Sequence, residues 1–73
     1  MRSLSAAQRQ AILARSPWEH GWFQGEGYHI FLKDEPDLNK AFAGSVGEVP
    51  VAVAEDWIIM HTLRHEQQQR DRT

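Results

Sequence analysis

The sequence contains no cysteine, so it can form neither a disulfide nor a thiolate metal site. It has no apolar run long enough to span a membrane, and its N-terminus lacks the apolar segment of a signal peptide. Composition, with 41% hydrophobic and 25% charged residues, is that of a globular chain. We therefore expect a soluble, cytoplasmic protein with no membrane partner and no cofactor.

The charge is unevenly distributed, which argues against a nucleic-acid binder, because such a protein normally carries a basic stripe and has a high pI. The chain has 8 lysines and arginines against 10 acids, and a net charge of -2. Residues 18–56 contain eight of the acids and only two lysines. We expect no nucleic-acid partner. The acidic middle is either a solvated rim or a surface that meets a basic partner.

Seventy-three residues are enough for one small domain, which we place at residues 1–73. A chain of this size buries only about 60% of its unfolded surface, so its stability is marginal. The last residues are rich in glutamine and charge, and we expect a frayed tail from about residue 69.

Residues 18–32 hold five of the seven aromatic residues. Two short runs of strand-forming residues flank Gly-Glu-Gly at 25–27, which is typical of a hairpin loop. We predict an antiparallel β-hairpin in which Phe23 pairs with His29, with side chains alternating between two faces. The face predicted to join the core carries Trp22, Tyr28, Ile30 and Leu32. The other face carries Phe23, His29 and Phe31.

That second hairpin face has two interpretations. Hydrophobic side chains usually end up inside, so a helix that covers the face is the simpler one. So small a chain, however, has little material with which to cover both faces of a hairpin. An uncovered aromatic face would be a contact site.

The flanking segments predict helices. Ser5 and Gln8 have the spacing of a capping box, and the helix that they begin should end at Arg15, before Pro17. Asp34 and Pro36 favour a second, short helix at about residues 35–43. These helices and the hairpin make up an α+β fold.

Residues 45–56 are ambiguous. The alternation of Val49, Val51 and Val53 favours a short third strand with Pro50 at a sheet edge. The alternative is that Pro50 begins a long helix that runs to the end of the chain. In the favoured version the last helix spans residues 55–69 and has two apolar faces. One contains Trp57, Ile58, His61 and His65; the opposite one contains Ile59, Met60 and Leu63.

His61 and His65 are four residues apart and so are neighbours on a helix, a spacing that can place two imidazoles on one metal ion. His20 and His29 in the hairpin are the candidates for further ligands. The simpler interpretation is that His61 packs beside Trp57.

No catalytic constellation is present. Glu19 and His20 are adjacent and so point in different directions, and each serine occupies a position that a cap or turn explains. Gly25-Glu26-Gly27 lacks the lysine of a phosphate-binding loop. We therefore do not expect an enzyme.

We predict a small single domain of class α+β, with an antiparallel β-hairpin, or three strands, packed against two or three helices. We predict a non-enzymatic protein of adaptor or inhibitor type that binds another protein; phage and mobile-element proteins fall in this size range. The candidate contact residues are Phe23, His29 and Phe31 on the hairpin, and Ile59, Met60 and Leu63 on the last helix. Either face also suits a homodimer. The alternative function is a divalent-metal-binding module that uses His61 and His65.

Overall fold

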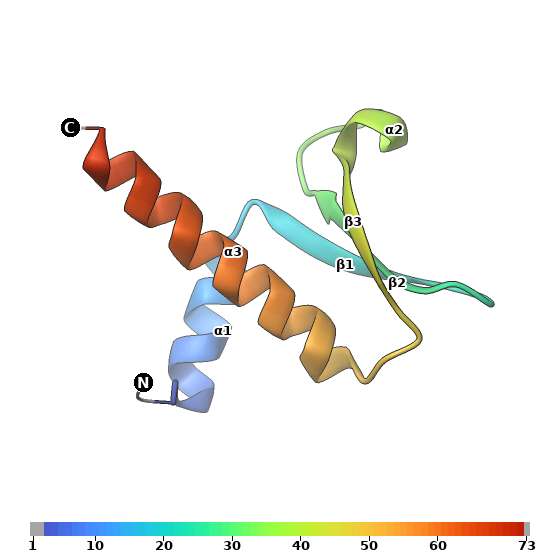
Figure 1. The fold of residues 1–73 in the computed structure, drawn as a ribbon, viewed down its shortest axis with the longest axis horizontal. Coiled ribbons are helices and arrows are strands. Elements are labelled where there is room, and N and C mark those ends of the chain that lie inside the picture. The colour runs from blue at the N-terminus through green and yellow to red at the C-terminus, as the bar shows by residue number, and fades with distance from the viewer. Residues whose placement is uncertain (1–2, 73) are drawn as a thin grey trace.

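A computed structural model describes residues 3–72 and shows three helices and one antiparallel sheet, which confirms the α+β class. The strand order is β1-β2-β3, so β2 is central. Helix α3 crosses one face of the sheet, α1 packs beside α3, and the short α2 lies beyond the end of β2 (Figure 1). No helix in the described part of the chain is long and apolar enough to cross a bilayer. The elements in order are α1 (Ala6–Arg15), β1 (Trp18–Phe23), β2 (Gly27–Leu32), α2 (Leu38–Ala41), β3 (Phe42–Gly47) and α3 (Val51–Asp71).

Helix α1 has the predicted boundaries, and hydrogen bonds satisfy backbone groups at both of its ends. Ser5 Oγ accepts a hydrogen bond from the Gln8 amide at 3.1 Å, and the Gln8 side chain accepts one from the Ser5 amide at 2.8 Å. This is the predicted capping box. At the other end, Lys33 donates from Nζ to the carbonyl of Leu13 at 3.1 Å. A cation there also complements the helix dipole.

The hairpin forms with the predicted faces but a different register. Phe23 pairs with Gly27 and Trp22 with Tyr28, whereas we expected Phe23 opposite His29. Each partner differs from the predicted one by two residues. Because side chains alternate with a period of two, every side chain still points to its predicted face.

Gly27 belongs to β2 rather than to the loop, which is why the register differs. Its φ of 87° lies in the left-handed region, and a Cβ placed on it would overlap the backbone of Gly47 in β3. The two strands approach so closely here that neither a side chain nor an ordinary backbone conformation fits. The loop therefore consists of residues 24–26.

The third strand exists, but not where the valine alternation placed it. It runs from Phe42 to Gly47, and the single helical turn of α2 stands where we expected a helix over residues 35–43. Asp37 rather than Asp34 caps this turn, accepting from the Asn39 amide at 3.0 Å. Antiparallel pairing with β2, interrupted by two register shifts, outweighs the helical spacing of the local sequence.

The predicted strand over Val49–Val53 is wrong, and the alternative is correct. Pro50 is the N-cap of α3, and Val51 is its first residue. At helical spacing of four, Ala54 and Ile58 then reach the core, whereas Val51 and Val53 stay on the exposed side. Helix α3 begins one turn earlier than predicted and runs to Asp71.

The core lies between α3 and one face of the sheet, and that face is the one predicted to join it. Ile30, Ala54 and Ile58 are completely or almost completely buried. Around them pack partly buried side chains from five elements: Leu13, Trp18, Tyr28, Val46 and Trp57. Trp22 shares this face but is 54% exposed, so it contributes little to the core.

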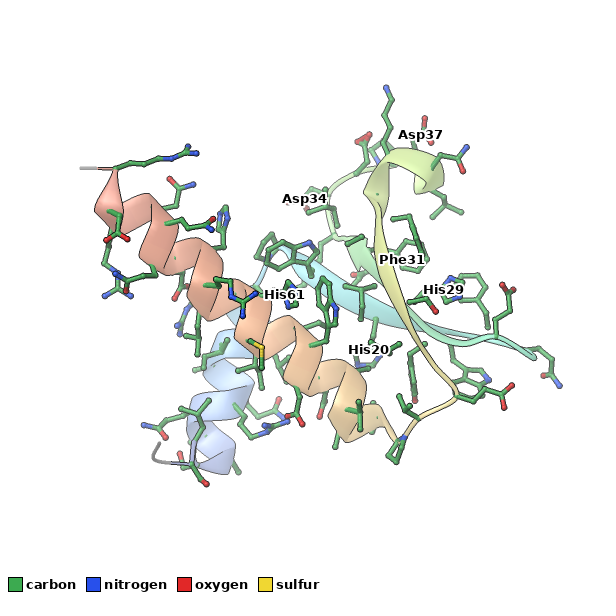
Figure 2. The ribbon with its side chains drawn as sticks, in the orientation of Figure 1. His20, His29, Phe31, Asp34, Asp37 and His61 are labelled. Carbon is green, nitrogen blue, oxygen red and sulfur yellow. The ribbon has the colours of Figure 1, made fainter. Side chains whose placement is uncertain are left out.

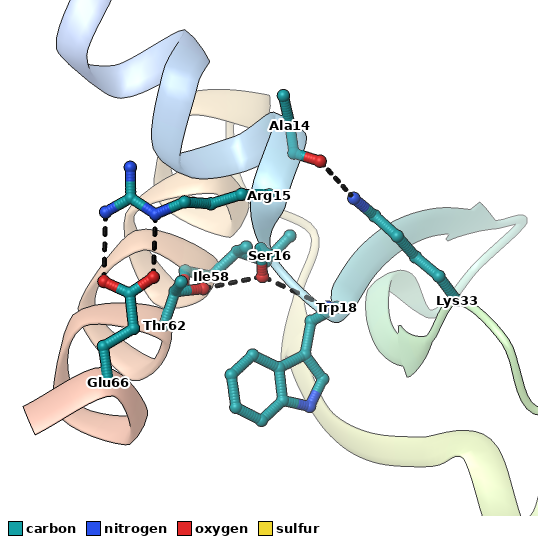
Figure 3. Close-up of polar contacts among 8 residues, drawn as sticks. All are labelled: Ala14, Arg15, Ser16, Trp18, Lys33, Ile58, Thr62 and Glu66. Atoms are coloured by element: carbon teal, nitrogen blue, oxygen red, sulfur yellow. Dashed lines mark hydrogen bonds and ion pairs between the residues drawn. The ribbon is translucent and has the colours of Figure 1, made fainter. Parts of the chain in front are cut away.

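Two polar contacts fix the angle between α1 and α3 (Figure 3). The hydroxyls of Ser16 and Thr62, both buried, share a hydrogen bond of 2.6 Å, and Ser16 Oγ also accepts from the Trp18 amide at 3.1 Å. Nearer the surface, Arg15 donates two hydrogen bonds to Glu66, at 2.7 and 3.0 Å. A paired guanidinium and carboxylate impose a defined geometry, so the chain enters β1 from a fixed position.

Candidate functional site

The sheet face that points away from α3 carries a cluster of four rings, which we call the aromatic face. Three of them, Phe23, His29 and Phe31, are the side chains that alternation placed there. The fourth is Phe42 of β3, which pairs with Phe31 across the ladder. Directly opposed residues project to the same side of a sheet, so the pairing brings Phe42 into the group.

The four rings pack against one another. Phe23 stacks on His29, with ring centroids 4.7 Å apart and an interplanar angle of 26°. Phe42 meets both His29 and Phe31 edge to face, at 5.4 and 5.9 Å. Phe23 and Phe31 lie 5.7 Å apart and lean together over Gly21, which has no side chain of its own to separate them. The four rings therefore form one connected cluster, two members of which, His29 and Phe31, are labelled in Figure 2.

Helix α3 does not cover these rings, and the single turn of α2 contacts β2 near the end of that strand. Helix α3 contacts β1 and β2, and its buried residues join the core on the opposite face. Phe23 is 37% exposed and Phe42 47% exposed. The side chain of His29 is 17% exposed. The face is therefore partly open: its rings shield one another, and Phe23 and Phe42 reach solvent.

Acidic side chains surround the aromatic face. Glu19 pairs with Phe31 across β1 and β2 and so projects from the same side of the sheet. Glu26 lies in the hairpin loop with Oε1 3.9 Å from His29 Nε2. Beyond the other end of β2 the chain continues through Asp34, Glu35 and Asp37, and Figure 2 shows Asp34 and Asp37 at that end of the sheet. The face is therefore an apolar centre with a negative rim.

The second predicted contact surface forms a groove on the side of α3 that faces away from the sheet. Met60 is 54% exposed, and Leu63 also reaches the surface. Ile59 is only 5% exposed, so it serves as the floor of the groove rather than as a free contact residue. The groove has a volume of ≈ 540 Å³ and is lined by Leu4, Asp56, Ile59, Met60, Leu63, Arg64 and Gln67.

The helix histidines are part of an aromatic cluster around Trp18. His61 stacks on Trp57 with a centroid distance of 3.7 Å and an interplanar angle of 7°. Trp18 meets Trp57, His61 and His65 edge to face, at 5.9, 6.4 and 5.9 Å. Packing therefore accounts for the positions of both imidazoles.

The other two histidines are not arranged as additional ligands. His20 contacts Tyr28 on the sheet face that meets α3, at a centroid distance of 5.3 Å, whereas His29 belongs to the aromatic face. The sheet itself separates the two imidazoles. Across residues 3–72, no group of three or more His, Asp or Glu side chains is placed to hold a metal ion.

Comparison with known proteins adds no relative: no family model, no curated protein and no solved structure matches this chain. What the chain does must therefore be argued from its own surfaces.

Sequence reasoning found three of the four rings and missed Phe42. The hairpin alternation identified the three because they lie within twelve residues on two adjacent strands. The helical spacing of residues 35–43 predicts a helix that includes Phe42, and nothing local in residues 42–47, which contain two glycines, indicates a strand. Only the pairing with β2 reveals its position.

Proposed function

We propose that this protein is a non-enzymatic binding protein of adaptor or inhibitor type that captures a basic segment of a partner protein on its aromatic face. The observation that carries the proposal is the set of four mutually packed rings on the sheet face that points away from α3. Aromatic residues are enriched at interfaces and dominate their energetics. Ordering them in advance lowers the entropy cost of binding.

The negative rim indicates which partners suit the face. Residues 18–50 contain six acids, at positions 19, 26, 34, 35, 37 and 48, against two lysines, a net charge of −4. Lys33 is held at the carbonyl end of α1 by its bonds to Leu13 and Ala14. The surroundings of the rings thus attract arginine or lysine side chains, which also bind favourably over aromatic faces. The same charge repels the phosphates of a nucleic acid.

A selection experiment tests the proposal. A library of random peptides displayed on phage is selected against the purified protein, and the binding of the enriched peptides is then measured by fluorescence anisotropy. We expect enrichment of sequences in which arginine or lysine flanks apolar residues. Binding should weaken as the salt concentration rises, because charge complementarity around an apolar centre is screened by ions.

Two variants assign the site. Phe42→Ser removes an exposed ring from the aromatic face and should weaken peptide binding by at least about tenfold, as expected for an interface residue worth over 1 kcal/mol. Trp22→Ser is the matched control, because it removes a ring that is equally exposed but lies on the opposite face of the sheet. Peptides that bind Phe42→Ser as tightly as the original protein would contradict the proposal.

A further inference from the structure

The groove on α3 carries opposite charges at its two ends. Asp56 and Arg64 line it on either side of Met60, and each is four residues from Met60. Residues four apart are neighbours on one face of a helix, so the three side chains form a row. With a rise of 1.5 Å per residue the charged ends are separated by about 12 Å along the helix axis. The row is negative, apolar and positive in turn.

Such a row is complementary to itself when it is reversed. If two copies of α3 pack antiparallel with a two-fold axis at Met60, Asp56 of each copy faces Arg64 of the other. The same operation brings the two methionine side chains together at the centre. A two-fold interface uses the same patch on both subunits, and this patch meets that condition.

We propose that the groove binds a second copy of this chain, through antiparallel α3 helices that cross at Met60. Leu63 and Leu4 border the row and add apolar area to the contact. A single acidic or basic partner would match only one end of the groove. A second copy forms two ion pairs, each between Asp56 of one chain and Arg64 of the other. We therefore favour it over an unrelated protein.

The charges at the ends are available for this contact. Arg64 has no ion pair within residues 3–72. Asp56 accepts an ion pair from Arg9 through Oδ1, at 2.8 Å, which leaves its second oxygen for the partner. A carboxylate has room for several donors, so the contact within the chain and the contact between chains are compatible.

The dimer contact is separate from the aromatic face. Helix α3 presents Ile58 and Ala54 to the sheet and Met60 to the groove, so the helix itself lies between the two surfaces. Each protomer of the dimer keeps its aromatic face open. A failure of the dimer proposal therefore leaves the peptide-binding proposal untouched, and the reverse also holds.

A charge-reversal experiment tests the two-fold arrangement. Molar mass is measured by light scattering over a concentration series for the original protein, for Asp56→Lys, for Arg64→Glu and for an equimolar mixture of the two variants. We expect the original protein to dimerise and each variant alone to stay monomeric, because like charges then face each other at both ends. In the mixture every facing pair is again opposite in sign, so dimers should reappear as heterodimers.

Controls separate the interface from the fold. Arg9→Gln removes the ion pair of Asp56 within the chain and should leave the dimer intact. Lys40→Glu makes the same charge change as Arg64→Glu on the distant helix α2 and should also dimerise. A monomeric original protein at all concentrations would overturn the proposal, and so would dimers of both variants alone or a mixture that stays monomeric.

Discussion

The imidazole of His61 lies parallel to the indole of Trp57, and its Nδ1 is 2.9 Å from the Trp57 carbonyl oxygen. A carbonyl can only accept a hydrogen bond, so Nδ1 carries the proton in this contact. The ring is thus fixed by stacking on one side and by a backbone hydrogen bond at its edge. This geometry gives His61 a structural role.

We expect neither zinc nor a chelator to change the melting temperature, because no ligand-rich site is organised around His61 in the described residues. His61→Phe keeps the stacked ring but loses the hydrogen bond, and should lower the free energy of unfolding by about 1 kcal/mol. Thermal unfolding followed by circular dichroism measures both effects. If zinc instead raised the melting temperature, and His65→Gln abolished the rise, the metal-binding alternative would replace this interpretation.

Gly25 and Gly27 offer a matched test of why the hairpin register is as it is. Both have a positive φ, 78° and 87°, so alanine strains the backbone at either position. At Gly25 the added methyl group meets open space, and we expect a loss of about 1 kcal/mol. At Gly27 it also overlaps the backbone of Gly47, so the loss should be about 3 kcal/mol or more. Urea unfolding of the two variants measures the difference, and equal losses would mean that β3 is not packed this closely.

The contact between Arg15 and Glu66 predicts a pH dependence. The hydrogen bond from Arg15, assisted by its charge, holds the pKa of Glu66 below its ordinary value. A depressed folded-state pKa contributes stability above the unfolded-state pKa, and this contribution is lost as pH falls through the folded-state value. The melting temperature of the original protein should exceed that of Glu66→Gln most at neutral pH, and the gap should close in acid.

The difference in melting temperature between the original protein and Glu66→Gln should be small. The ion pair of Arg15 and Glu66 is open to solvent, and salt screens it. Glu48→Gln is the control, since Glu48 is exposed and has no ion pair in residues 3–72. Its melting temperature should follow that of the original protein across the pH range. A gap for Glu66→Gln that stayed constant with pH would show that the ion pair contributes nothing to stability.

The parts of the fold that the sequence predicts are those determined by interactions between residues close together in the chain. Ser5 and Gln8 specify the start of α1, and alternation in residues 18–32 divides the hairpin side chains correctly even though the pairing differed by two residues. The segment from Asp34 to Val53 could not be predicted in this way. Its strand has little β-propensity of its own and forms because β2 offers an unpaired edge, whereas the valines that alternate like a strand begin a helix.

The same distinction holds for the candidate surfaces. Helical spacing correctly places Met60 and Leu63 on the side of α3 that faces away from the sheet, but it cannot say that Leu4 of a distant segment completes the groove. Nor does it reveal that Ile59 is buried. Both depend on the angle between α1 and α3, which contacts between residues about fifty positions apart determine.

A pair of adjacent residues in β2 separates core from contact surface. Ile30 is completely buried against α3, while Phe31, the next residue, points to the aromatic face. Ile30→Ser removes a core side chain and buries a hydroxyl, and we expect a loss of about 4 kcal/mol, which is enough to unfold so small a domain. Phe31→Ser forfeits contacts with neighbouring rings that are themselves partly exposed, so the loss should be about 1 to 2 kcal/mol. Urea unfolding of both variants gives the comparison.

Phe31→Ser should then remain folded and still lose affinity for the peptides selected on the original protein. Peptide affinity should fall much more than the free energy of unfolding, because the rings of a binding face contribute more to binding than to folding. If Phe31→Ser proved as destabilising as Ile30→Ser, the aromatic face would be a second core rather than a contact surface. The four rings would then have to be buried by another part of the protein or by a second chain. The acidic residues around them would no longer support binding of a basic peptide.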